Sequence, residues 1–104
     1  MLRMRHMAGR AAPTVLCDHC GYGIDDAETA WYQWLEGLSG PVTGEIFFLH
    51  KVCVDPFEAD HPPADDQMWA NMELACFPIY LGNYLQLDWD AAQDLAESMG
   101  RGLE

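Results

Sequence analysis

The segments that decide the fold are Cys-Asp-His-Cys at residues 17–20 and His-Lys-Val-Cys at residues 50–53. Each begins and ends with a metal-binding side chain, with two residues between them, and 29 residues lie between the two segments. Zinc is bound in a tetrahedron by sulfur and nitrogen ligands, and two close pairs brought together by folding supply that set. Four protein ligands leave no open position, so the predicted site is structural and not catalytic. The sequence thus predicts one zinc ion (Zn²⁺) per chain, bound by Cys17, Cys20, His50 and Cys53.

Residues next to these pairs favour the same interpretation. Gly21 directly follows the second cysteine, where a residue with positive φ allows backbone amides to turn toward the thiolates of a zinc knuckle. The apolar run at residues 45–49 favours a strand that ends at His50, and Asp55-Pro56 is typical of the start of a helix. The chain has no secretory signal, so we expect reduced cysteines that bind metal, with Cys76 outside the site.

The pattern Cys-x2-Cys-Gly-x2-Ile at residues 17–24, followed by His-x2-Cys, resembles the first zinc module of LIM domains and, more broadly, treble-clef zinc fingers. The resemblance covers about residues 15–60. The 29-residue spacer is longer than the LIM pattern, and no second cysteine-rich module follows Cys53, so we use the broader treble-clef resemblance. It implies a zinc-stabilised scaffold that is used mainly to bind other proteins.

Between the metal-binding pairs, the composition indicates a β-hairpin. Residues 29–35 are rich in strand-forming aromatics, residues 37–41 break the pattern, and residues 45–49 supply the second strand. An isolated hairpin is only marginally stable. We therefore expect its aromatic side chains to pack in the core; the alternative is that they form a binding surface. The aromatic side chains in question are Trp31, Trp34, Phe47 and Phe48.

The segment at residues 58–66 is typical of a linker, and the residues after it suggest helices. Met68, Met72 and Ala75 recur at helical spacing, which predicts a helix capped by Asp65 or Asp66 and ended or kinked by Pro78. Residues 79–85 predict a second short helix. A third begins at Asp88 as N-cap and ends at Gly100.

Together these elements predict an α+β fold: a small zinc-stapled, treble-clef-like β-hairpin packed on a C-terminal bundle of short α-helices. We divide the chain into a flexible basic N-terminus (residues 1–12), the knuckle, hairpin and short helix (13–60), and an acidic helical part (61–104). The last two should form one cooperative unit, because about 40 residues are near the lower limit for independent folding.

The charge of the chain limits the classes of function. Seventeen acidic residues stand against five lysines and arginines, which gives a formal net charge of −12. Binding to phosphates needs the opposite sign, so we expect no direct nucleic-acid partner. No apolar run is long enough for a membrane span, and we expect a cytoplasmic protein. Common catalytic motifs are absent, although His19 or His61 in place of one ligand would leave an open metal site.

These observations favour a non-enzymatic, zinc-stabilised acidic adaptor that binds another protein. The alternative is a small acidic inhibitor, of the kind that mobile elements carry, which occupies the basic groove of a nucleic-acid-handling enzyme. High negative charge would steer such an inhibitor toward a basic groove. The sequence does not identify the protein partner.

Overall fold

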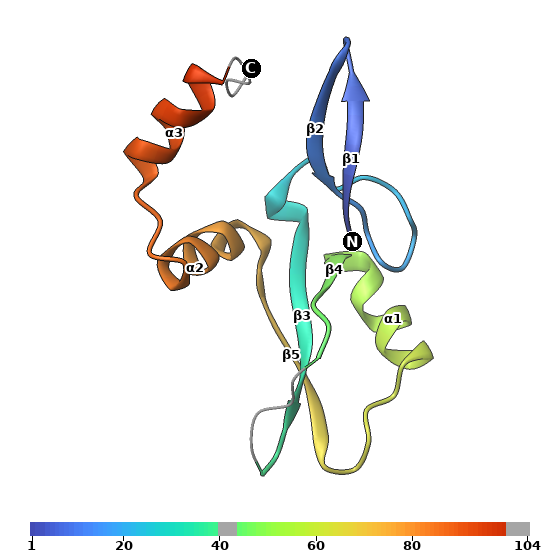
Figure 1. The fold of residues 1–104 in the computed structure, drawn as a ribbon. Helices are drawn as coiled ribbons and strands as arrows, with labels where there is room; N and C mark the ends of the chain where they lie inside the picture. The colour runs from blue at the N-terminus through green and yellow to red at the C-terminus, as the bar shows by residue number, and fades with distance from the viewer. Residues whose placement is uncertain (40–43, 100–104) are drawn as a thin grey trace.

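The computed structural model describes residues 1–39 and 44–99. Within this part, the chain is a mixed α/β protein with two antiparallel sheets and three α-helices (Figure 1). The predicted stop at Gly100 and two of the five residues of the predicted strand break at 37–41 lie outside the described residues. None of the described helices has the length and apolar character that crossing a membrane requires.

The N-terminal residues, which the sequence predicts as a flexible basic segment, form a hairpin. Strand β1 (Leu2–Met7) pairs with β2 (Arg10–Val15) across six residue pairs. The two-residue turn has positive φ at both Ala8 and Gly9, the geometry that matches the twist of paired strands. Alanine rarely adopts a positive φ, and Asn-Gly is the pair that normally identifies this turn in a sequence. Ala8-Gly9 therefore gives no clear signal for a hairpin.

The central sheet has three strands in the order β4-β3-β5. Strands β3 (Ala30–Gly37) and β4 (Phe47–His50) confirm the predicted hairpin. The third strand, β5 (Gln67–Glu73), replaces the helix expected around Met68 and Met72. Met68 and Met72 are four residues apart, a spacing that places them on one side of a helix and also on one side of a strand. Seven residue pairs with β3 select the strand.

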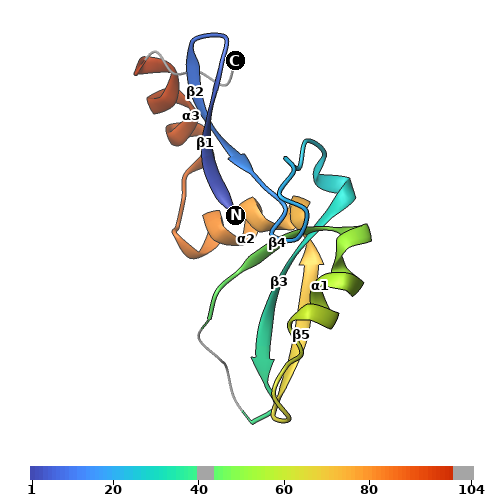
Figure 2. The same ribbon diagram turned by 90° about the vertical axis from the view of Figure 1, so that its right-hand side faces the viewer.

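The two faces of this sheet are covered by different helices, which lie on opposite sides of it (Figure 2). Helix α1 (Val54–Asp60) follows a short 3-10 helix, Lys51–Cys53, and covers one face through the buried ring of Phe57. That ring lies 5.1 Å from Phe47 and 5.5 Å from Trp69. The core therefore forms between α1 and the sheet.

The opposite face packs against the start of helix α2 (Phe77–Tyr84), which follows the 3-10 helix Leu74–Cys76. The ring of Phe77 lies 5.1 Å from Tyr32 and 5.2 Å from Phe48. Pro78 stands at the beginning of α2, where its missing N–H has no consequence, and not at the end of a preceding helix. The predicted core role is confirmed for Phe48, which is buried, and the other three hairpin aromatics are partly buried against the same core.

Helix α3 (Trp89–Ser98) begins where the sequence predicts it, because the Asp88 side chain accepts a hydrogen bond from the backbone N–H of Ala91. The indole of Trp89 lies directly over Gly82, where a Cβ would come within 2.5 Å of the ring. Beyond this contact α3 extends away from the sheet (Figure 1). Leu95 and Met99 stay more than half exposed, so α2 and α3 do not form the predicted packed bundle.

Candidate metal centre

The structure brings together the four residues that the sequence predicts as ligands. Their ligand atoms all lie within 4.8 Å of one another. Two of the cysteines belong to the turn that leads from β2 toward β3, whereas His50 ends β4 and Cys53 directly precedes α1. The cluster therefore joins three parts of the fold that are separated along the chain.

The first pair sits in a tight turn that backbone hydrogen bonds close. The N–H of Cys17 donates to the carbonyl of Tyr22 at 2.9 Å, and the N–H of Gly21 donates back to the carbonyl of Cys17 at 3.0 Å. Gly21 has a backbone φ of +79°, which residues with a Cβ atom rarely adopt. The predicted role of this glycine is thus confirmed.

Asp18 fastens this turn to the sheet, and sequence reasoning did not identify it as part of the site. Its backbone N–H donates to the Phe48 carbonyl at 2.7 Å, while its carboxylate accepts from the Phe48 N–H at 2.8 Å. Phe48 is two residues before His50, so these bonds hold the cysteine pair beside the second pair. An acceptor side chain next to a ligand cysteine was the only sequence signal for this role.

One distance within the cluster can be compared with the edge of a zinc tetrahedron. With Zn–S of about 2.3 Å and Zn–N of about 2.05 Å, a sulfur and a nitrogen at two corners lie about 3.6 Å apart. Cys20 Sγ and His50 Nδ1 are 3.4 Å apart. Cys17 and Cys53 are buried, whereas Cys20 is exposed, so the cluster lies at the edge of the core. Three cysteines and one histidine are thus placed so that they could hold one metal ion.

The two buried cysteines have very different pKa values without a metal. Burial raises the pKa of Cys17, but hydrogen bonds from the backbone at Cys20, His50 and His19 outweigh it and lower the pKa to about 6. Burial raises the pKa of Cys53 to about 12, with further contributions from hydrogen bonds and charge repulsion involving Cys17 and Cys20. A metal ligand must be a thiolate, so metal binding should release the proton of Cys53.

The other candidate ligands lie outside the cluster. Among the described residues, three or more potential ligands come together only in this cluster, which does not include His19, His61 or Cys76. The ring of His61 stacks on Phe57 at 4.3 Å, and its Nδ1 lies 2.9 Å from the Phe57 carbonyl oxygen. His61 therefore packs on helix α1, and the sequence alternative of a substituted, open site is not supported.

The fold and the site thus define a small mixed α/β protein with a Cys3His cluster able to hold one metal ion. Comparison of the chain with protein-family models, with curated proteins and with solved structures finds no match.

Proposed function

We propose that this protein is a non-enzymatic adaptor, in which structural zinc stabilises a treble-clef-like module and the C-terminal helices bind another protein. The observation that carries this proposal is the exposed apolar surface of residues 79–99. The metal and the surface have separate roles: the metal holds the scaffold, and the helices make the contact.

The donor chemistry supports zinc as the metal. Three cysteine sulfurs and one imidazole nitrogen are the ligand set of many structural zinc sites. The elements at the site also follow the treble-clef order of knuckle, hairpin and helix, since β3 and β4 lie between the two ligand pairs and α1 follows Cys53 directly. A zinc ion with four protein ligands supplies a cross-link and no open coordination position.

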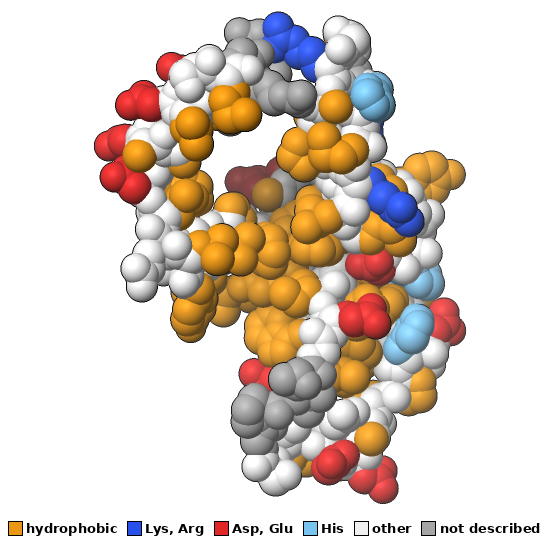
Figure 3. Space-filling view, in the orientation of Figure 1, with side chains coloured by type: hydrophobic (Ala, Val, Ile, Leu, Met, Phe, Trp, Pro, Cys, Tyr) orange, Lys and Arg blue, Asp and Glu red, His pale blue; other side chains and the backbone are white. Residues whose placement is uncertain are grey.

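Exposed apolar side chains gather over helix α2 and the neighbouring part of the sheet, with further apolar patches along α3 (Figure 3). Of the 17 large apolar side chains that are exposed in the described part of the chain, nine lie within residues 79–99. A concentration of exposed large apolar side chains in one part of a chain is typical of an interaction site. The nine residues, which we call the C-terminal apolar surface, are Ile79, Tyr80, Leu81, Tyr84, Leu85, Leu87, Trp89, Leu95 and Met99.

The shape of the chain agrees with this role. Its radius of gyration is 16.1 Å, whereas a compact domain of this length has about 13 Å. Helix α3 extends away from the sheet (Figure 1) and is accessible to a partner. On α3 the acids Asp90, Asp94 and Glu97 recur at helical spacing, apart from the apolar positions Leu95 and Met99. A partner that covers the apolar face would leave this acidic stripe in contact with water.

The test is capture of a partner by the tagged full chain from lysate at low and high salt, compared between matched variants. Leu95 and Met4 have equal exposed fractions, 61%, but only Leu95 belongs to the C-terminal apolar surface. We expect Leu95→Asp to lose a partner that Met4→Asp keeps, and we expect capture to persist at high salt. If high salt releases the partner and Leu95→Asp retains it, the acidic inhibitor is the better description, because exposed ion pairs are screened.

A further inference from the structure

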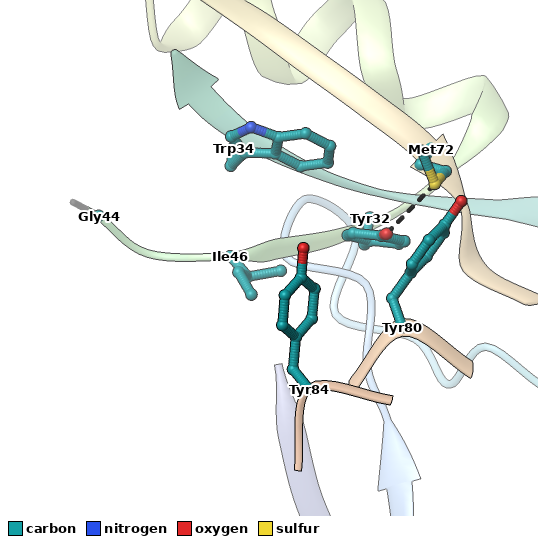
Figure 4. Close-up of a pocket in the computed structure, with 7 residues that line it drawn as sticks. All are labelled: Tyr32, Trp34, Gly44, Ile46, Met72, Tyr80 and Tyr84. Atoms are coloured by element: carbon teal, nitrogen blue, oxygen red, sulfur yellow. Dashed lines mark hydrogen bonds between the residues drawn. The ribbon is translucent and has the colours of Figure 1, made fainter. Parts of the chain in front are cut away.

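A groove of about 650 Å³ lies between helix α2 and the sheet face that packs against it (Figure 4). Small-molecule sites in proteins have volumes of about 300–1,000 Å³. Strand β3, strand β5, the segment before β4 and helix α2 all contribute to its walls. The side chains that line it, which define the aromatic groove, are Tyr32, Trp34, Ile46, Met72, Tyr80 and Tyr84.

Four aromatic rings dominate these walls, and none of the lining side chains carries a formal charge. Tyr32 and Trp34 stack with centroids 5.4 Å apart, and the Tyr32 hydroxyl donates to the Met72 sulfur at 3.4 Å. Figure 4 shows the rings of Trp34, Tyr80 and Tyr84 around one open space. The faces of aromatic rings are electron-rich and attract cations, most strongly when the cation has shed its water.

The charge around the groove has the sign that a cation requires. The indole N–H of Trp34 donates to the carboxylate of Glu36 at 3.3 Å, and Glu36 is two residues further along the same face of β3. The nearby cation Lys51 lies on the other face of the sheet, where its Nζ forms an ion pair with the Glu73 carboxylate at 2.9 Å. With a net charge of −12 on the chain, the potential favours cations and disfavours anions.

We infer that the aromatic groove binds a small molecule that carries a quaternary or similarly methylated ammonium group. A primary ammonium is compact and strongly hydrated, so apolar walls penalise its desolvation. Methyl groups spread the charge over an apolar surface that fits ring faces. This ligand site is a second activity, and it shares only Tyr80 and Tyr84 with the C-terminal apolar surface proposed for the protein contact.

Three related probes separate the cationic contribution from simple apolar binding. Choline carries the trimethylammonium group, 3,3-dimethylbutan-1-ol has the same shape without charge, and ethanolamine has a primary ammonium. Each is titrated into the full chain as purified, with sodium chloride adjusted to hold ionic strength constant. The indole N–H resonance of Trp34, identified by its absence from Trp34→Phe, reports binding.

We expect choline to bind at least about tenfold more tightly than either of the other probes. Tyr84→Leu should weaken choline binding several-fold, whereas Tyr84→Phe, which keeps the ring, should not. Tyr22→Leu is the matched control, because Tyr22 and Tyr84 are both largely exposed but Tyr22 lies on the zinc knuckle. Equal affinity for choline and the neutral alcohol, no response to any probe, or unchanged choline binding in Tyr84→Leu would each overturn the inference.

Discussion

Replacing Cys20 by serine tests whether the metal holds the fold together. Cys20 is the exposed member of the cluster, so the substitution removes a ligand without opening a cavity in the core. An exposed substitution without a special role changes the free energy of unfolding by only about 0.5 kcal/mol. Any large effect of Cys20→Ser therefore reports the loss of the metal.

The expected effect exceeds the stability of the domain. A structural zinc ion contributes about 10–16 kcal/mol of apparent binding free energy at neutral pH, and a domain of this size is stable by about 5–15 kcal/mol in total. Without the metal, the cysteine turn keeps only contacts such as the two hydrogen bonds between Asp18 and Phe48. We expect the metal-free chain to lose the folded structure of residues 15–60.

The assay combines metal content with thermal unfolding followed by circular dichroism. Wild-type protein should hold one zinc ion per chain and unfold cooperatively, and Cys20→Ser should lose both properties, as should chelated wild-type protein. Cys76→Ser is the control, because Cys76 lies outside the cluster. A Cys20→Ser chain that keeps a full zinc ion, or that melts within a few degrees of wild type, would refute the reasoning, since about 1 kcal/mol already shifts Tm by 4–8 °C.

Three further substitutions test the packing, a helix cap and an ion pair. Phe57→Ala should lower the free energy of unfolding by about 3–5 kcal/mol in urea titrations, because the ring is 2% exposed, and a loss under about 1 kcal/mol would contradict its place in the core. Asp88→Ala should remove about 1 kcal/mol of helix stability and speed amide hydrogen exchange in α3, an effect that Asp90→Ala should not reproduce. Hydrogen bonds from Lys51 and Trp31 lower the pKa of Glu73, so the folded state favours the ionised carboxylate. The stability that this pair contributes is therefore present above the unfolded-state pKa and is lost as the pH falls through the folded-state pKa. Urea midpoints measured from pH 7 to pH 3 should therefore fall less for Glu73→Gln than for wild type, and identical profiles would count against this pair.

Several features of the protein could be predicted from the sequence because their causes are local. Two-residue spacing within each ligand pair places both side chains in one turn, whatever the rest of the fold does. The aromatic composition of residues 30–37 indicates a strand, and Asp88 caps a helix through a bond to an amide three residues away. The net charge is independent of folding altogether.

Other features depend on residues that are far apart in the chain, and only the tertiary structure decided them. The segment at residues 67–73 has a pattern that a helix and a strand satisfy equally, and the open edge of β3, more than 30 residues earlier, selects the strand. The aromatic groove likewise exists only where β3, β5 and the segment before β4 meet α2. A short apolar pattern indicates which side chains share a face of a helix or strand. Which segments pair with one another depends on hydrogen bonds between residues far apart in the sequence, and these form only when the whole chain folds.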